Sequence, residues 1–420
     1  MKSGARLAAA VEILDDMAAH HRTAQLALAD WGKSHRFAGS GDRAAIGTLV
    51  YDVLRRKQSL AAKMQSDASR ALVLAAASRA YGITGEAVAA LADGSEHALA
   101  PLSADEQAGL ARELPADTPG HISGDYPEWL QASFDRAFGT SAPAEGAALA
   151  MRAPVDLRVN SLKADREKVL KALAHFGAAA TPISPLGVRI AAPEGAAKAP
   201  HVEAEAAHGK GWFEVQDEGS QIAAAIAAAG PRQQVLDLCA GSGGKALAMA
   251  AAMQNTGQIN AYDRDKSQLR PIFERLKRAG VRNVQTMTAG DEAALRKEGA
   301  RFDLVLVDAP CTGSGTWRRK PDAKWRLKPQ NLAQRQDEQR AVLELAARLV
   351  KPGGRLVYVT CSVLPEENID QIDAFIAAHP QYSKLPVAMD GLPASAGPVT
   401  LTPHQNGTDG FFVAPLLKSK

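Results

Sequence analysis

Two cysteines and an aspartate follow apolar segments of the kind that forms buried β-strands. Asp308-Ala-Pro-Cys311 comes directly after Phe302–Val307, and Cys361 comes directly after Gly354–Thr360. Because the carboxyl ends of parallel strands meet at one edge of a sheet, we expect these three side chains to converge on one pocket. Most intracellular cysteines are small buried side chains, yet two at neighbouring strand ends favour a catalytic role. A thiolate that adds to carbon 6 of a pyrimidine makes carbon 5 nucleophilic.

A glycine-rich loop follows a third apolar segment, Val235–Leu238, and precedes an expected helix. The glycines allow a ligand to approach the backbone closely, and the helix N-terminus favours a negative group. Asp263 ends the next strand, where its carboxylate is placed to hold ribose hydroxyls. The sequence therefore predicts a nucleotide-type ligand at this loop, which consists of Cys239, Ala240, Gly241, Ser242, Gly243, Gly244 and Lys245.

Three classes of ligand compete for this loop. A P-loop needs Ser or Thr after its Lys to bind magnesium, whereas Ala246 occupies that position. Gly241-x-Gly243-x-x-Ala246 fits a variant of the dinucleotide-binding pattern. S-adenosylmethionine enzymes use the same strand, loop and acidic residue, so the loop alone does not choose between the last two classes. Hydride transfer by a nicotinamide enzyme would need neither thiol.

From Gln234 onward, apolar strands alternate with helices. This alternation predicts an α/β fold with a Rossmann-like, doubly wound and mostly parallel sheet. The expected strands are Val235–Leu238, Gln258–Tyr262, Phe302–Val307 and Gly354–Thr360, and the expected helices are Lys245–Met253, Lys266–Ala279, Asn331–Val350 and Glu366–His379.

The chain before this sheet has a different pattern. Up to about residue 140 it is helical, with helices expected at Leu7–His20 and Ala44–Leu60 and Asp42 as the N-cap of the second. Residues 138–154 read as a linker. A small α/β unit follows, with strands at Val155–Asn160 and Gly187–Ala191, a helix at Asp165–Phe176, and a loop at 192–210.

Composition restricts the class of protein. The 420 residues are 46% apolar and 23% charged, which is ordinary for a globular enzyme and argues against disorder. Three scattered cysteines exclude a disulfide framework and leave no metal site expected. The chain contains no apolar run of about 18 residues, and Glu12, Asp15 and Asp16 come too early for a signal peptide. We expect a cytoplasmic protein without a membrane partner.

Net charge differs along the chain. It is +3 over residues 1–60, −7 over 61–150 and +7 over 151–420. A dense basic stretch contains Arg318, Arg319, Lys320, Lys324 and Arg326, interleaved with Trp317 and Trp325. Cations beside stacking rings suit single-stranded nucleic acid, while the alternative is a solvated loop with two core tryptophans.

Taken together, the motifs resemble the RsmB/Sun group of 5-methylcytosine RNA methyltransferases, in the order in which that group carries them. One departure is the glycine loop, in which Ser242 and Ala246 stand where the group usually has Pro and Thr. The resemblance rests on LRVNSLK (Leu157–Lys163), VQDEGSQ (Val215–Gln221), LDLCAGSGGK, DAPCTGSGT, RRKPDAKW, YVTCSVLPEEN and DGFFVAPL.

The resemblance implies a role for each matching residue. The loop Cys239–Lys245 would cradle the methionyl part of S-adenosylmethionine, Asp263 would hold the ribose, and Asp291 would contact the adenine. Asp291 could instead be only a helix N-cap. Asp308 would face both cofactor and cytosine. Cys361 would be the nucleophile, and Cys311 would help to release the product.

The resemblance also implies contacts with RNA. Residues 7–60 are similar to the helical RNA-binding domain of the NusB type, which favours ribosomal over transfer RNA. The expected domains are a NusB-like domain at 1–140, a small RRM-like unit at 150–212 and a methyltransferase domain at 213–420. We expect a monomer that binds small-subunit (16S-type) ribosomal RNA or the assembling subunit. The residues expected to contact RNA are Arg318, Arg319, Lys320, Lys324, Trp325, Arg158 and Asn160.

Other functions remain open at this point. A transfer RNA methyltransferase would use the same chemistry on a different substrate. A DNA cytosine methyltransferase would use Cys311 as its nucleophile, and a catalytically idle RNA-binding assembly factor would use neither thiol. The presence of both cysteines and of Asp308 disfavours the idle protein.

Overall fold

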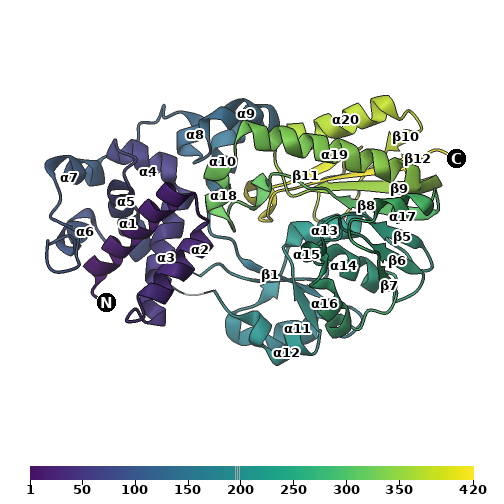
Figure 1. The fold of residues 1–420 in the computed structure, drawn as a ribbon, viewed down its shortest axis with the longest axis horizontal. Helices are drawn as coiled ribbons and strands as arrows, with labels where there is room; N and C mark the ends of the chain where they lie inside the picture. The colour runs from purple at the N-terminus through teal and green to yellow at the C-terminus, as the bar shows by residue number, and fades with distance from the viewer. Residues whose placement is uncertain (194, 196, 198) are drawn as a thin grey trace. The chain divides into compact units, whose positions relative to one another are not determined.

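The chain divides into two compact units. The structure is a computed structural model that describes residues 1–193, 195, 197 and 199–420. The helical unit consists of Met1–Arg152, Ala192–Ala199 and Trp317–Leu327, and the α/β unit consists of Ala153–Ala191, Pro200–Thr316 and Lys328–Lys420. Figure 1 shows the ribbon of the chain.

The helical unit packs short helices around one apolar core. Residues such as Leu7, Ile46, Leu49 and Leu74 are fully buried there. Most of these helices are shorter than the roughly 12–15 residues that an isolated helix needs, so they depend on packing for their stability. The helices are α1 (Ser3–His20), α2 (Ala24–Ser34), α3 (Ser40–Arg55), α4 (Lys57–Met64), α5 (Ser69–Tyr81), α6 (Gly85–Leu91), α7 (Ala104–Ala111), α8 (Gly120–Ser123), α9 (Gln131–Phe138), α10 (Ala142–Leu149) and α18 (Pro321–Arg326).

A distant segment of the chain completes the helical unit. Trp317 is buried, and its ring lies 6.1 Å from that of Phe134, which in turn stacks on Tyr126 at 4.1 Å between ring centroids. The following helix, α18, packs on α3. The segment Trp317–Leu327 is therefore part of the core of this unit rather than a free loop.

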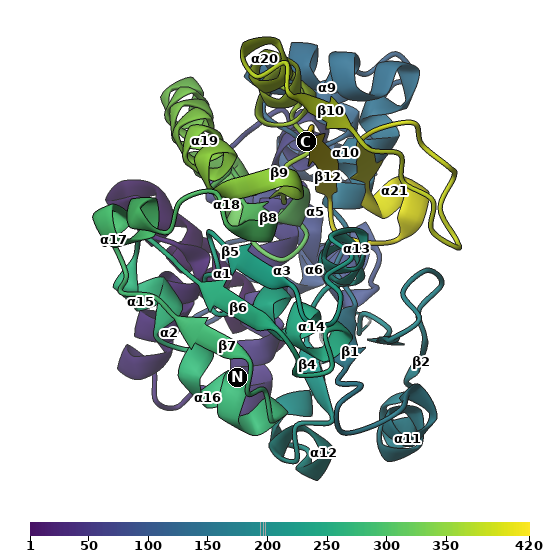
Figure 2. The same cartoon turned by 90° about the vertical axis from the view of Figure 1, so that its right-hand side faces the viewer.

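The α/β unit contains an eight-stranded mixed sheet. Its order is β10-β12-β9-β8-β5-β6-β7, with β11 paired to β12. The pairs β5·β6, β6·β7, β5·β8 and β8·β9 are parallel, whereas β12 runs antiparallel to β9. Figure 2 shows β5, β6 and β7 side by side. The strands are β5 (Gln234–Asp237), β6 (Gln258–Ala261), β7 (Val284–Thr286), β8 (Phe302–Asp308), β9 (Val350–Thr360), β10 (Tyr382–Lys384), β11 (Val399–Leu401) and β12 (Phe411–Lys418).

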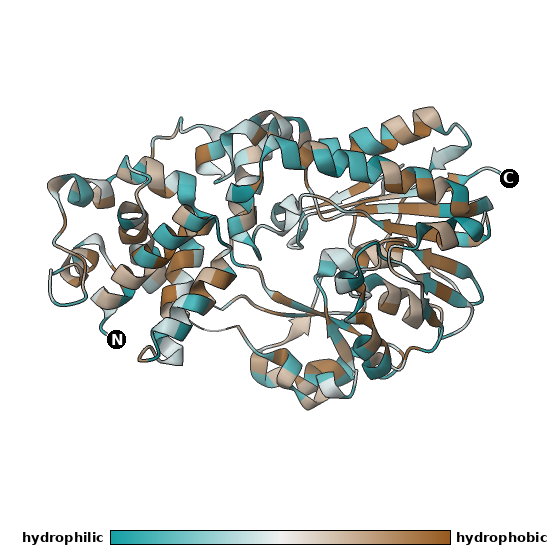
Figure 3. Cartoon of the chain, viewed as in Figure 1, coloured by the Kyte–Doolittle hydropathy of each residue, from teal (hydrophilic) through white to brown (hydrophobic). Residues whose placement is uncertain are grey.

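Helices cover both faces of this sheet, because its central strands are apolar on both sides. In β8, Val305 and Val307 pack into the core cluster that holds α19 and α20, while Leu304 and Leu306 pack into the cluster that holds α13 and α14. The hydrophobic stretches of these strands are visible in Figure 3. The helices are α13 (Glu218–Ile226), α14 (Gly244–Ala252), α15 (Lys266–Leu269), α16 (Ile272–Ala279), α17 (Glu292–Lys297), α19 (Pro329–Leu349), α20 (Ile369–Ala378) and α21 (Pro403–Asn406).

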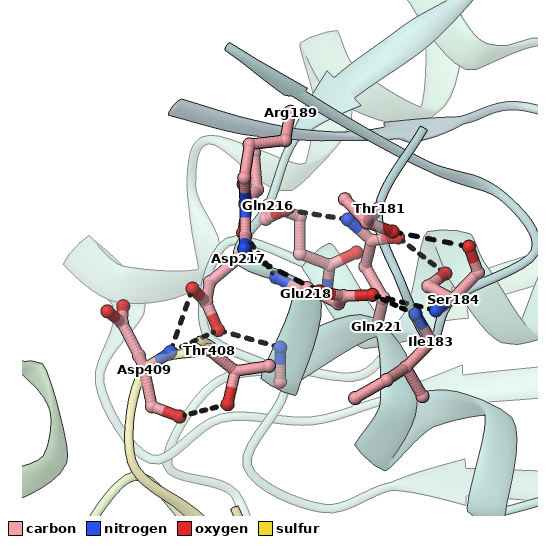
Figure 4. Close-up of polar contacts among 12 residues, drawn as sticks. Thr181, Ile183, Ser184, Arg189, Gln216, Asp217, Glu218, Gln221, Thr408 and Asp409 are labelled. Atoms are coloured by element: carbon pink, nitrogen blue, oxygen red, sulfur yellow. Dashed lines mark hydrogen bonds and ion pairs between the residues drawn. The ribbon is translucent and has the colours of Figure 1, made fainter. Parts of the chain in front are cut away.

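A smaller antiparallel sheet, in the order β2-β3-β1-β4, belongs to the same unit. Its strands are β1 (Val155–Val159), β2 (Ala179–Ala180), β3 (Gly187–Ile190) and β4 (Phe213–Val215), accompanied by α11 (Arg166–Ala172) and α12 (Ala206–Gly209). Polar contacts join it to α13, as Figure 4 shows. The buried carboxylate of Glu218 accepts from the backbone N–H groups of Ile183 and Ser184, both at 2.8 Å. Asp217, the residue before α13, accepts from the N–H of Asp409, which lies just before β12, at 3.1 Å.

The predicted doubly wound sheet is confirmed, and its four predicted strands correspond to β5, β6, β8 and β9. The linker predicted at 138–154 is wrong, because Ala142–Leu149 form α10 with a proline in its first turn. Asp42 is not the N-cap of α3. Gly39 holds that position, and Asp42 accepts from the N–H of Gly39 at 3.1 Å. The helix predicted at Lys266–Ala279 is split at Pro271 into α15 and α16.

The loop predicted at 192–210 includes residues 194, 196 and 198, which lie outside the described residues. Its later part contains the short helix α12. Among the residues described by the structure, no helix is both long and apolar enough to cross a membrane.

Candidate active site

Two thiols meet where β8 and β9 end. Cys311 lies in the loop after β8, Cys361 directly follows β9, and their Sγ atoms are 3.4 Å apart. Backbone hydrogen bonds hold the two loops together, from the N–H of Ala309 to the oxygen of Val359 at 2.8 Å and from the N–H of Gly315 to the oxygen of Cys361 at 2.9 Å. The convergence predicted from the parallel strand ends is thus present for the two cysteines.

The two thiols are not equivalent. The hydrogen bond to Cys361, followed by burial, raises the pKa of the Cys311 thiol well above its ordinary value. The Cys311 thiol therefore holds its proton more tightly than a free cysteine does. A neighbour that keeps its proton is what a Cys361 nucleophile would require.

Asp308, at the end of β8, forms an ion pair with the lysine of the glycine-rich loop. Lys245 Nζ lies 2.6 Å from Asp308 Oδ2, and Lys245 is only 7% exposed whereas the Asp308 side chain is 34% exposed. Burial alone would lower the pKa of Lys245, but the contact with Asp308 outweighs it and the pKa is raised. Lys245 is consequently a fixed cation that orients the Asp308 carboxylate.

The glycine-rich loop lies between β5 and α14. Gly243 has φ +82°, and a side chain there would collide with Ile272. Beside Gly241, by contrast, a Cβ would meet no atom within 4 Å. The N–H of Gly241 donates to Asp263 Oδ2 at 2.8 Å. The loop therefore combines a helix N-terminus, open space and a carboxylate, which is a fit for a nucleoside-containing ligand.

Two arginines form hydrogen bonds to backbone carbonyl oxygens of the glycine-rich loop. Arg158, which is 4% exposed, donates to the carbonyl oxygen of Gly244 at 3.1 Å, and burial lowers its pKa to about 10. Arg275 donates to the carbonyl oxygen of Ser242 at 3.0 Å and pairs with the buried Glu214 at 3.0 Å. These side chains position the loop.

Asp291 is the N-cap of α17. Its Oδ1 accepts from the N–H of Ala294 at 2.9 Å, so the alternative role considered from the sequence is present in the structure. The N–H of Gly290 donates to the backbone oxygen of Asp263 at 3.2 Å. The turn that carries Asp291 is thus tied to the end of β6.

The residues expected to contact RNA fall into two groups. Arg319 and Lys320 are exposed, whereas Arg318 and Lys324 are 5% and 1% exposed. Lys324 Nζ donates to the backbone oxygen of Arg55 at 2.9 Å, and burial lowers its pKa to about 7. Trp325 Nε1 donates to the oxygen of Leu54 at 2.6 Å. The expectation of an open basic surface is wrong for Arg318 and Lys324, because they are buried in the helical unit.

Arg158 and Asn160 are also buried. The Asn160 amide, 4% exposed, donates to the backbone oxygens of Gly211 and Ala279 at 2.9 and 2.8 Å. It joins the small sheet to the end of α16. The prediction of an RNA surface at these two positions is therefore wrong, because their polar atoms bond to backbone carbonyls inside the α/β unit.

Two further buried carboxyl groups, those of Asp237 and Glu367, were not singled out from the sequence. Asp237 ends β5 and is 1% exposed, and neither carboxyl oxygen has a hydrogen-bond partner among the described residues. Burial is the main cause, and the charge of Asp308 the second, of a rise in the pKa of Asp237 to about 7. Glu367 accepts from the N–H and Oγ1 of Thr312 at 2.7 and 2.5 Å, next to Cys311. Only the position of Asp237 at a strand end could have drawn attention to it.

The strand order, with antiparallel β12 beside β9 and a glycine loop after the central β5, defines a class I methyltransferase. The family description 16S rRNA methyltransferase RsmB/F matches residues 224–417, and that of an RsmF/B-like ferredoxin-like domain matches 126–196. The chain belongs to the RsmB/F methyltransferase family.

Individual proteins with similar sequences or structures support this family assignment. The probable ribosomal RNA small subunit methyltransferase B of Synechocystis is 33% identical over 307 residues, covering 70% of this chain and 67% of that protein. The chain spans about two thirds of the length of the curated relatives it matches. A solved protein called PH0851 has a TM-score of 0.73 at 25% identity, covering 100% of this chain and 99% of that one. NSun6 from Pyrococcus horikoshii, solved with SFG, has a TM-score of 0.62 at 22% identity, covering 70% and 98%.

Proposed function

We propose that the protein transfers a methyl group from S-adenosylmethionine to carbon 5 of a cytosine in small-subunit ribosomal RNA, through a covalent bond between Cys361 and carbon 6. The observation that carries this proposal is the thiol pair, in which Cys361 Sγ lies 3.4 Å from a Cys311 thiol whose pKa is raised by that contact and by burial. Family membership and the names of the relatives support ribosomal RNA as the substrate.

The cofactor assignment rests on the open, helix-terminal loop beside Asp263. S-adenosylmethionine, when bound, supplies an electrophilic methyl group. Cys239–Lys245 would hold its methionyl part, Asp263 its ribose and Asp291 its adenine. SFG, with which the neighbour NSun6 was solved, is an analogue of this compound.

The remaining chemistry belongs to side chains of the α/β unit. The Cys361 thiolate forms a bond to carbon 6 of cytosine, and the electron pair displaced toward the ring makes carbon 5 nucleophilic. Asp308, oriented by Lys245, faces ring nitrogen 3 and holds the proton that this nitrogen takes up from solvent as the adduct forms. After carbon 5 is alkylated, a water molecule takes its remaining proton and the bond between Cys361 and carbon 6 breaks. The Cys311 thiol protonates the departing sulfur and then regains a proton from solvent.

RNA binding is assigned to the helical unit and the small sheet. We propose that residues 1–140 form a NusB-like RNA-binding domain, that 150–212 form an RRM-like unit, and that 213–420 carry the reaction. A target cytosine must leave its stack to reach Cys361, as in other base-modifying enzymes. Of the basic stretch, the exposed Arg319 and Lys320 are retained as RNA contacts.

The test is methyl transfer from tritiated S-adenosylmethionine to 16S ribosomal RNA from a strain lacking the gene, followed by bisulfite sequencing of the product. We expect one protected cytosine that is lost with Cys361→Ala. Label in transfer RNA alone would assign transfer RNA as the substrate. Label that persists in Cys361→Ala would contradict the covalent route. An absence of label would favour a catalytically idle binding protein.

A further inference from the structure

A cavity within the helical unit is lined by an excess of arginines. Its volume is about 810 Å³, and one face of α3 forms a wall with residues spaced four apart, Arg43, Gly47, Tyr51 and Arg55. Gly47 leaves this wall without a side chain, and a Cβ there would meet only Leu28, at 3.9 Å. The arginines that line the cavity are Arg43, Arg55, Arg56, Arg79, Arg152 and Arg319.

Among the described residues that line this cavity, Asp52 is the one carboxylate. It lies 3.7 Å from Arg56 Nε and 3.9 Å from Arg79 Nε, so it is shared between two guanidinium groups at distances longer than a close ion pair. Among the described residues, the arginines that line the cavity therefore outnumber the carboxylates.

The guanidinium groups repel one another. Burial, opposed by Asp52 and assisted by the positive charges of Arg152 and Arg56, lowers the pKa of Arg55 to about 10. Burial and the charge of Arg79 lower the pKa of Arg56 in the same way. The Nε atoms of Arg55 and Arg56 are buried, and neither has a hydrogen-bond partner among the described residues. Buried donors without acceptors are costly, and an anionic ligand would satisfy them.

We propose that this cavity binds a nucleotide unit of the RNA substrate through its phosphate group. The volume exceeds what one phosphate ion needs and suits a nucleotide. The ring of Tyr51, 5.7 Å from the Arg55 guanidinium, and the ring of Trp31 add aromatic surface for a base. The proposal rests on the proposed function, since it takes RNA as the substrate, but it is tested by binding rather than by methyl transfer.

The experiment uses the full chain and a fluorescein-labelled single-stranded RNA oligonucleotide, with binding followed by anisotropy over a series of salt concentrations. Arg79→Gln removes a half-exposed arginine that contributes little to the core. We expect affinity to fall roughly tenfold and the salt slope to fall by about 0.7, the value for one phosphate contact on a single strand. Arg22→Gln is the matched control, because Arg22 is similarly exposed and lies outside the cavity.

A second variant has the opposite expected sign. Asp52→Asn removes the carboxylate while keeping its size, so RNA should bind more tightly and with a steeper salt slope. A merely structural role would weaken binding in both variants. Affinities and slopes that match the native protein in Arg79→Gln and Asp52→Asn would overturn the proposal.

Two further arms separate the remaining outcomes. Adenosine monophosphate and inorganic phosphate are added as competitors. If each protects the cavity arginines from chemical modification but neither displaces the labelled RNA, the cavity is a small-anion site instead. Methyl transfer is measured on the same samples. Normal transfer with unchanged RNA binding in Arg79→Gln would contradict this inference alone, whereas absent transfer in the native protein would contradict the proposed function.

Discussion

Cys311 Sγ lies 3.4 Å from Cys361 Sγ, and this contact together with burial raises the pKa of the Cys311 thiol. The proposed roles, Cys361 as the nucleophile and Cys311 as the acid, require a difference of this kind between the two sulfurs. This asymmetry argues against the DNA-type alternative, in which the cysteine after Asp308-Ala-Pro would attack the base.

Separate replacement of the two cysteines should give opposite results. Cys361→Ala should abolish methyl transfer, because no other thiolate reaches carbon 6. Cys311→Ala should instead trap a protein–RNA adduct, because the departing Cys361 sulfur lacks its acid. Denaturing electrophoresis with labelled RNA detects the adduct, and Cys311→Ala/Cys361→Ala serves as the control that should lack it. Full turnover by Cys361→Ala would refute the assignment.

Glu367 should act as a positioning residue through Thr312. Glu367→Gln loses an acceptor for the N–H or Oγ1 of Thr312, so the Cys311 loop should loosen and kcat should fall by about tenfold or more. The KM for S-adenosylmethionine should stay unchanged, since the glycine loop is untouched. Glu344→Gln, an exposed glutamate of the same unit, is the control. A rise in KM without a fall in kcat would count against this role.

Asp237 should make stability depend on pH. Its pKa is about 7 in the folded protein against an ordinary value of 3.8, so between these values the folded state holds a proton that the unfolded chain has released. The free energy of unfolding should therefore fall as the pH rises from about 4 to 7. Asp237→Asn should remove this slope and gain up to about 4 kcal/mol above pH 7. Denaturant unfolding at several pH values measures it, and a difference independent of pH would contradict it.

Arg158→Met should affect the cofactor loop and leave RNA affinity unchanged. Without its bond to the Gly244 oxygen the loop is less fixed, so S-adenosylmethionine should bind several-fold more weakly by calorimetry. The salt slope of RNA binding should remain that of the native protein. Arg282→Met, at an exposed position in the same unit, is the control. A salt slope lowered by about 0.7 with normal cofactor affinity would instead support Arg158 as an RNA contact.

Trp325→Phe should destabilise the helical unit. The ring remains, but the hydrogen bond to the Leu54 oxygen is lost, at a cost of about 1 kcal/mol. Urea unfolding followed by circular dichroism should show a lower midpoint for this unit. Trp129→Phe, at a tryptophan 37% exposed in the same unit, should show little change. Equal midpoints for both variants would indicate that the bond contributes nothing.

The central sheet could be predicted because β5, β8 and β9 contain continuous apolar segments and because strands alternate with helices along this part of the chain. The short strand β7 (Val284–Thr286) lacks such a signal, since it is half exposed. β12 is an apolar and buried run, but Pro415 within it argues against a strand inside a sheet. The positions of Cys311 and Cys361 followed from the rule that parallel strands end at one edge.

The environments of Arg158, Asn160 and Lys324 could not be predicted in this way. A basic residue in a sequence suggests solvent or phosphate, but each of these side chains donates to a carbonyl oxygen distant along the chain, such as Gly244 or Arg55. The carbonyl partner is a product of the fold and has no signature in local sequence. Asp237 was missed for a related reason, because only burial distinguishes it from an ordinary carboxylate.

The segment Trp317–Leu327 lies in sequence between parts of the α/β unit, but it belongs to the helical unit and completes the core around Phe134. The helical unit is consequently discontinuous, and no single cut in the gene separates it from the rest. A shortened protein beginning near residue 153 would still carry Trp317 and Trp325, now without the helices that bury them, and should aggregate. Gene fission or the exchange of this unit between relatives would have to transplant the distant segment as well, so the two units are constrained to be inherited together.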